Sequence, residues 1–267
     1  MQTKELNPFE TSSNTLTVFM PSGFTVEIRE QNGEDDDILS KYGDAIDGSA
    51  LHNFLAGIIV NNSLQPGTPT QASDVLQWKV KDKYYLLLKS RMFSLGKDYY
   101  FKHTFQDGNT VEFEEDLSMY DWDLSNPKNP LPKEGDKNYF KYRITPYING
   151  LEKHRIITLS SNKKVRYEYL TGIGEKIMLG INETDLSKND ELRIRNLSLE
   201  VNGSFQIIQQ FKAFSTRDMA EIRRDMELND TEFKLQVELK NPKNGVLEIQ
   251  SLASLGSFFF PTIRKID

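Results

Sequence analysis

The sequence predicts an α+β fold: a helical N-terminal half that contains a β-hairpin knuckle, and a strand-rich C-terminal half that a second hairpin closes. Two observations carry this prediction. Apolar residues recur at helical spacing in much of 49–96, and they alternate at strand spacing in several runs of 139–252. In both halves, short loops rich in Asn, Asp and Gly separate neighbouring alternating runs, which is typical of hairpins.

The clearest hairpin pattern lies near the C-terminus. Largely alternating apolar residues at 233–239 and 246–252 flank the loop 241–245, Asn-Pro-Lys-Asn-Gly, in which Asn244-Gly245 can supply the positive φ angles of a tight turn. An earlier stretch has the same layout, with a loop at 106–108. We therefore expect one hairpin in each half of the chain.

The N-terminal region predicts an extended arm followed by the first packed elements. Residues 1–20 are polar with scattered apolar side chains, which is typical of an arm that is either disordered or ordered only against a partner. After a turn at 21–23, residues 24–28 alternate as a strand. Four carboxylates at 34–37 then favour the start of a helix that reaches residue 42, because they complement its positive end.

Two longer helices are expected between residues 48 and 96. The first begins at Gly48-Ser49 and has apolar residues at i, i+3, i+4, i+7 and i+8 from position 51. His52 lies off this stripe, which predicts a surface histidine. Asp82 is expected to cap the second helix, 84–95, and Arg91 lies beside its apolar stripe, where it needs a partner.

The chain is expected to divide at a linker. Residues 126–137 include three prolines, and prolines at this density break regular secondary structure. This composition favours a linker between a subdomain at 21–125 and a strand-rich subdomain at 138–267.

Turn and cap signals recur in the second subdomain. Asn149-Gly150 predicts a hairpin turn, and Asn202-Gly203 joins two further alternating runs. Residues 172–176 predict another turn. Ser215 and Asp218 have the spacing of a capping box at the start of a helix.

Composition excludes several kinds of site. The 267-residue chain has no Cys and three widely separated His, so we expect no disulfide, no metal site and no cofactor. Its net charge of −6 with mixed signs argues against nucleic-acid binding. No apolar window is long enough for a membrane span, and the N-terminus lacks the pattern of a signal peptide.

We do not expect an enzyme. The sequence lacks the nucleophile elbow, the dinucleotide fingerprint and the kinase motifs. Folding could pair carboxylates such as Asp35, Glu114 and Asp121 into a glycosidase-like dyad, which leaves a cell-wall glycan hydrolase as the least favoured alternative.

Apolar residues near the two ends of the chain are the candidate interface residues. Three consecutive Phe at 258–260 are too apolar to remain in water, so they pack into the chain's own core or into a neighbour. The arm contributes further apolar side chains. The candidate interface residues are Phe9, Leu16, Phe19, Phe258, Phe259 and Phe260.

Several stretches, in this order and spacing, resemble the baseplate and tail-assembly proteins of contractile-tailed bacteriophages, the family of the T-even phage baseplate hub protein. They are the turn and strand at 21–28, the helix start at 33–39, the apolar helix at 51–60, the element at 82–96, the first hairpin, the helix at 218–223, and the closing stretch at 241–261.

The resemblance implies a structural subunit of a contractile tail baseplate, which works by burying interfaces in a multi-copy assembly. The implied partners are other tail or baseplate proteins and further copies of the chain, and the implied location is the virion after synthesis in the bacterial cytoplasm. The alternative is an assembly chaperone that is absent from the mature virion.

Overall fold

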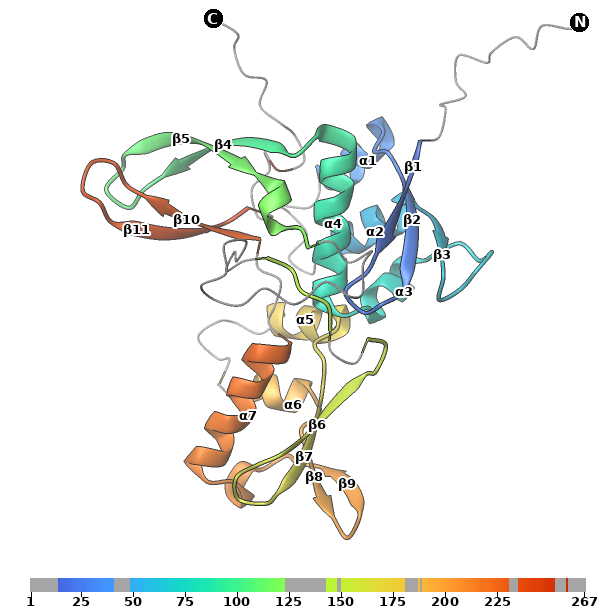
Figure 1. Ribbon diagram of the computed structural model, residues 1–267, viewed down its shortest axis with the longest axis vertical. Helices are drawn as coiled ribbons and strands as arrows, with labels where there is room; N and C mark the ends of the chain where they lie inside the picture. The colour runs from blue at the N-terminus through green and yellow to red at the C-terminus, as the bar shows by residue number, and fades with distance from the viewer. Residues whose placement is uncertain are drawn as a thin grey trace, which may run out of the picture.

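The structure is a computed structural model that describes residues 14–40, 49–122, 143–147, 150–180, 187, 189–230, 235–252 and 258. In these residues, helices accompany four small antiparallel sheets, which confirms the α+β class (Figure 1). The helices are α1 (Gly33–Leu39), α2 (Ser49–Ile58), α3 (Ala72–Gln77), α4 (Val80–Leu95), α5 (Gly172–Leu179), α6 (Asp190–Ile194) and α7 (Thr216–Asn229).

The strands are grouped by sheet. The first sheet has the order β1 (Thr15–Phe19), β2 (Thr25–Arg29), β3 (Ile59–Asn62). Two hairpins follow, β4 (Asp98–Thr104) with β5 (Thr110–Asp116) and β10 (Gln236–Lys240) with β11 (Leu247–Ser251). The fourth sheet has the order β6 (His154–Thr158), β7 (Lys164–Glu168), β8 (Ser198–Val201), β9 (Ser204–Ile207).

The first core is built around α4. This helix lies between the β1–β2–β3 sheet with α1–α3 on one side and the two hairpins on the other (Figure 1). The core contains buried apolar residues from β1, β2, α1–α4, β4 and β10 and from neighbouring segments; they include Ile28, Phe54, Leu55, Leu87, Tyr99, Phe105, Leu117, Leu239 and Phe258.

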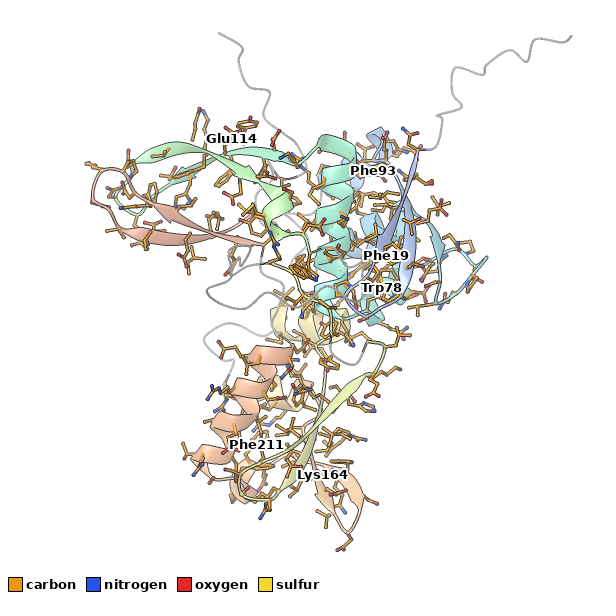
Figure 2. All side chains as sticks on the ribbon, in the orientation of Figure 1. Phe19, Trp78, Phe93, Glu114, Lys164 and Phe211 are labelled. Atoms are coloured by element: carbon orange, nitrogen blue, oxygen red, sulfur yellow. The ribbon has the colours of Figure 1, made fainter. Side chains whose placement is uncertain are left out.

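The second core lies below the first. Helix α7 covers one face of the β6–β9 sheet, with Met219, Ile222 and Met226 turned inward as predicted. Its capping box is also confirmed, because Ser215 accepts from the Asp218 N–H while the Asp218 carboxylate accepts from the Ser215 N–H. Figure 2 shows Lys164 and Phe211 in this lower part of the molecule.

The arm predicted for residues 1–20 is shorter in the structure. Residues 15–19 form β1, which pairs with β2 across the turn at 21–23. Alternate side chains of this edge strand face the first core, so Val18 is buried, and Met20 just beyond it is buried too. Residues 1–13 lie outside the described residues.

The predicted division at 126–137 does not separate the two cores. The closing hairpin belongs to the first core, because Val237 and Leu239 pack in the same apolar cluster as Phe101 and Phe105. Contacts between segments more than 130 residues apart therefore override the sequence boundary. The proposed linker itself lies outside the described residues.

Three local predictions also differ from the structure. The strand at 154–158 pairs with 164–168, and Asn162, with φ of 62°, supplies the positive φ of that turn; residues 143–147 form no strand. Helix α4 begins at Val80, earlier than predicted. Residues 172–179 form α5 where a turn was expected, because the Thr171 hydroxyl caps the helix at the Gly174 N–H.

Candidate assembly interface

The two hairpins stack into one projecting element, which we call the hairpin arm (β4, β5, β10 and β11; Figure 1). Polar contacts fix how they stack. The Glu248 carboxylate lies 3.0 Å from His103 Nε2 and accepts from the Gln106 N–H at 3.0 Å. At the loops, Asn241 Nδ2 donates to the Asp107 carboxylate at 3.1 Å. Glu248 is thereby held on the face of β11 that looks toward β4 and β5.

This orientation turns the apolar residues of β11 outward. Register pairs Leu239 with Glu248 and Val237 with Gln250, so these four side chains share the inward face. Leu247 and Ile249 must then point to the opposite face, where they are 62% and 60% exposed, and the preceding Val246 is 51% exposed. We call Val246, Leu247 and Ile249 the β11 strip.

A strip of this kind is unusual in a folded chain. An edge strand normally carries its polar residues outward, and proteins blunt exposed edges with Lys, Pro or a bulge. Strand β11 has no Lys, Pro or bulge. Its polar residues Glu248 and Gln250 face inward, and its apolar residues Leu247 and Ile249 face outward. Contiguous exposed apolar residues mark interaction sites more often than isolated ones do, so the β11 strip is the candidate interface.

The β6–β9 sheet offers a second, more polar surface. The face opposite α7 carries the paired residues Ile156 and Arg166, and at the other edge Ile207; both Ile side chains are about half exposed. Arg166 lies over the Phe205 ring, 5.0 Å from its centroid. The Lys164–Glu200 salt bridge places two opposite charges next to each other on this face.

The structure distributes the sequence-predicted interface residues differently. Phe19, at 42% exposed, lies on β1, and Leu16 is half buried against the first core. Phe258 is fully buried in the chain's own core, where its ring meets Tyr99 edge to face. Phe9, Phe259 and Phe260 lie outside the described residues. Sequence reasoning missed the β11 strip.

A buried polar junction connects the two cores at the start of α4. Backbone hydrogen bonds join residues 78–80 to residues 170–172 there. The Val80 N–H donates to the Leu170 carbonyl at 2.9 Å, and the Gly172 N–H donates to the Trp78 carbonyl at 3.0 Å. The polar side chains buried at this point are those of Lys79, which directly precedes α4, and of Lys81, Asp82 and Lys83 in the first turn of the helix. The prediction that Asp82 caps the helix is wrong, because its carboxylate bonds to Ser22 instead.

The lysines of the junction lie against aromatic rings. Lys79 Nζ is 4.1 Å from the Tyr147 ring centroid and 4.2 Å from that of Tyr169, and it donates to the Gly150 carbonyl at 2.6 Å. Lys81 Nζ is 4.3 Å from the Tyr147 centroid. Burial lowers the pKa of Lys79 to about 8 and also lowers the pKa of Lys81.

Lys83 joins α4 to α5. Its ammonium pairs with Glu175, and it lies 3.0 Å from His52 Nε2. His52 is therefore buried, contrary to the predicted surface position, because the start of α5 covers it. Gly172 permits this approach, since a Cβ there would lie 2.7 Å from the Leu76 carbonyl and 2.9 Å from Lys83 Nζ.

Asp82 makes the junction sensitive to pH. Burial raises the pKa of its carboxyl from 3.8 to about 6, although Ser22, Lys79 and Lys81 act to lower it. The folded protein therefore keeps this proton up to about pH 6, whereas the unfolded chain releases it near pH 4. The contribution of Asp82 to the free energy of unfolding therefore falls as pH rises through this window and levels off above it.

We expect Asp82→Asn to remove this pH dependence. The difference in unfolding free energy between the wild type and the variant should change by about 2.4 kcal/mol between pH 4 and pH 7, with the wild type losing stability as pH rises. Chemical denaturation at several pH values measures it, and the comparison cancels the other carboxyls. Parallel curves for the two proteins would contradict the assignment.

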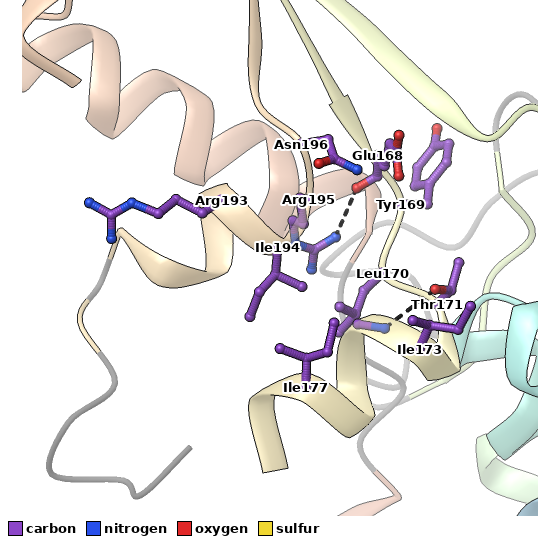
Figure 3. A pocket seen from close by; sticks show the side chains of 11 residues that line it. Glu168, Tyr169, Leu170, Thr171, Ile173, Ile177, Arg193, Ile194, Arg195 and Asn196 are labelled. Carbon is purple, nitrogen blue, oxygen red and sulfur yellow. Dashed lines mark hydrogen bonds between the residues drawn. The ribbon is translucent and has the colours of Figure 1, made fainter. Parts of the chain in front are cut away.

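A hollow lies between α5, α6 and the end of β7 (Figure 3). Ile173, Ile177 and Ile194 supply apolar walls. Its two arginines are already engaged: Arg193 pairs with Asp190, and Arg195 pairs with Asp230 and donates to the Glu168 carbonyl at 3.5 Å. The lining therefore supports the packing of α5 against α6.

The carboxyls considered for a glycosidase dyad each have structural partners. Asp35 pairs with Arg29 and closes the capping box of α1. Asp121 accepts from Lys89 Nζ at 2.6 Å and from the Tyr85 hydroxyl at 2.8 Å. Glu114, an exposed residue of β5 (Figure 2), accepts from the Tyr100 hydroxyl. Each of the three carboxylates therefore has a hydrogen-bond or ion-pair partner within the fold.

The part of the chain that the structure describes contains no group of three or more His, Asp or Glu side chains placed to hold a metal ion. None of its helices combines the length and apolar character that crossing a membrane requires.

Fold and surface together define an α+β protein whose most distinctive exposed feature is an apolar strand edge. Residues 20–260 match a family model described as T4 bacteriophage base plate protein. The match covers most of the chain, so the chain belongs to this family, as the order of its motifs predicted. Searches of curated proteins and of solved structures found no match. The family makes this a bacteriophage baseplate-related protein of the viral tail, with other phage tail proteins as partners.

Proposed function

We propose that the chain is a structural subunit of a contractile tail baseplate, and that it acts through protein–protein interfaces in a multi-copy assembly. Membership of the baseplate family supports this role, and the β11 strip is the observation that carries it. The strip is suited to binding a protein partner, because the described residues leave all three of its apolar side chains at least half exposed to water.

The energy at stake is sufficient for an interface. Complete burial of a Leu, Ile or Val side chain contributes about 1.5–3 kcal/mol. Each residue of the strip is at least half exposed, so covering all three supplies a few kcal/mol. Such clusters at the centre of a contact commonly dominate binding.

Replacing two residues of the β11 strip with Glu tests the proposed role as a structural subunit. We expect the double variant Leu247→Glu/Ile249→Glu to fold with a stability within about 1 kcal/mol of wild type, because both side chains already face water. Phage carrying it should yield few complete tails, since two carboxylates cannot be buried against an apolar partner. Plaque yield and electron microscopy of lysates measure the effect.

The matched control is Val60→Glu/Leu64→Glu, which places the same charges on exposed apolar residues of another surface. Normal tails with the control and defective tails with the strip variant support the proposal. Normal tails containing the strip variant would refute the use of this surface.

Mass spectrometry of purified virions separates a subunit from an assembly chaperone. A structural subunit gives peptides from this chain in stoichiometric amounts. Their absence from particles, together with a tail defect when the chain is missing, would replace the structural role with that of a chaperone.

A further inference from the structure

We propose that the β11 strip binds a second copy of the same chain. In this arrangement β11 pairs antiparallel with β11 of the other copy about a two-fold axis at Ile249, which gives a continuous β10–β11–β11–β10 sheet. The inference rests on the proposed function, because it names the partner of that same surface.

The backbone of β11 is oriented for this pairing. The Val246 carbonyl accepts from the Asn241 N–H at 2.8 Å, and the Leu252 N–H donates to the Leu235 carbonyl at 2.6 Å. In an antiparallel ladder, residues whose backbone groups bond to the neighbouring strand alternate with residues whose backbone groups point away from it. Val246, Glu248 and Gln250 therefore turn their backbone groups toward β10. The backbone groups of Leu247 and Ile249 therefore point to the outer edge.

No described strand pairs with that edge, since β10 and β11 form a two-stranded sheet. A two-fold axis at Ile249 makes this residue exchange both N–H···O bonds with its equivalent in the second copy. The pairing thus uses edge groups that the described part of the sheet leaves unused.

The side chains favour the same register. With the axis at Ile249, each Glu248 lies opposite Gln250 of the second copy, where an amide can donate to a carboxylate. On the outward face the two Ile249 side chains meet, with Leu247 further along each strand. An axis at Glu248 would instead place two like charges directly opposite, which is unfavourable.

The strand is thus self-complementary in hydrogen bonding, charge and apolar pattern, which is the condition for an interface that a two-fold axis generates. It is also short. Pairing of two five-residue strands buries less than the roughly 1,200 Å² of a standard interface, so the dimer should form in a concentration-dependent way.

The absence of Cys allows a direct test. In the proposed register the two Ile249 Cα atoms lie about 5.5 Å apart, within the range of a disulfide. The two Leu247 Cα atoms are four residues out of register, more than about 13 Å apart, and cannot be bridged. Ile249→Cys should therefore form disulfide dimers under mild oxidation, at least tenfold faster than Leu247→Cys.

The full-length chain is used, with Val60→Cys as a control for random collisions between exposed thiols. Sedimentation velocity over a range of concentrations should show a monomer–dimer equilibrium for the wild type. Ile249→Lys should shift it at least tenfold toward monomer. Equal cross-linking of Ile249→Cys and Val60→Cys, or a wild type that remains monomeric throughout, would overturn the proposal.

The outcomes separate this inference from the proposed function. A monomeric chain whose strip variant still fails to form tails refutes self-pairing but retains the subunit role. A chain that dimerises but is absent from virions supports self-pairing and refutes the subunit role.

Discussion

Replacing Asp230 with Ala is expected to destabilise the protein by about 3–5 kcal/mol, the cost of removing the buried partner of a buried charge. Asp230 pairs with Arg195, which is itself buried. Its carboxylate also accepts from the Leu170 N–H at 2.7 Å and from the Tyr147 hydroxyl at 3.0 Å. The substitution therefore strands three donors at once.

The electrostatics agree with this assignment. Burial acts to lower the pKa of Arg195, but Asp230 and Glu191 outweigh burial, and the pKa is raised overall. Burial raises the pKa of Tyr147 well above its ordinary value, and Asp230 raises it further. Both residues thus remain protonated donors to Asp230 at neutral pH.

Urea denaturation followed by circular dichroism measures the loss. The matched control is Glu112→Ala, which breaks the Lys102–Glu112 pair, whose side chains are 65% and 77% exposed. This control should cost less than about 1 kcal/mol. The double variant Arg195→Met/Asp230→Ala should recover part of the stability, because no charge is then left buried. Equal losses for Asp230→Ala and Glu112→Ala would contradict the argument.

Replacing Phe258 with Ala is expected to cost about 3–5 kcal/mol, as for other large-to-small changes at fully buried aromatic positions. The ring is fully buried, with its centroid 5.5 Å from that of Tyr99. The Phe258 carbonyl accepts from Arg91 Nε at 2.7 Å, which supplies the partner that the sequence led us to expect for this arginine.

Deleting residues 257–267 should cost more than Phe258→Ala, because it also removes the acceptor for the buried Arg91. Thermal denaturation of the full chain, of Phe258→Ala and of the truncated protein ranks the three. A shorter truncation that keeps residue 258, ending after Phe260, is the control. A chain lacking 257–267 that is soluble and as stable as wild type would show that Phe258 does not hold the hairpin arm to α4.

Local patterns predicted the elements that depend on near neighbours. Residues 236–240 and 247–251 form the closing hairpin, with Gly245 at φ of 75° in its loop. The first hairpin, the helix from Thr216 and the hairpin at Asn202-Gly203 were predicted equally well. In each case the deciding groups are only a few residues apart.

At the buried polar junction, the predictions for His52 and Asp82 were wrong because distant contacts decide the positions of these side chains. His52 is buried because α5, some 120 residues later in the chain, covers it beside Lys83. Asp82 bonds to Ser22 rather than capping its helix. Nothing in the spacing of Lys79, Lys81, Asp82 and Lys83 indicates that two cores meet at this point.

For the candidate interface, the sequence by itself determined the strands, the apolar content of β11 and the family. Only the tertiary structure decided which side of β11 faces water. Lys240 pairs with Leu247, so residues of odd number in β10 pair with residues of even number in β11. The apolar residues of both strands have odd numbers, and they must therefore lie on opposite faces. Loop length alone leaves this register open. The contacts of Glu248 with His103 and Gln106 fix β11's polar face toward the first hairpin, and the apolar strip is left outside.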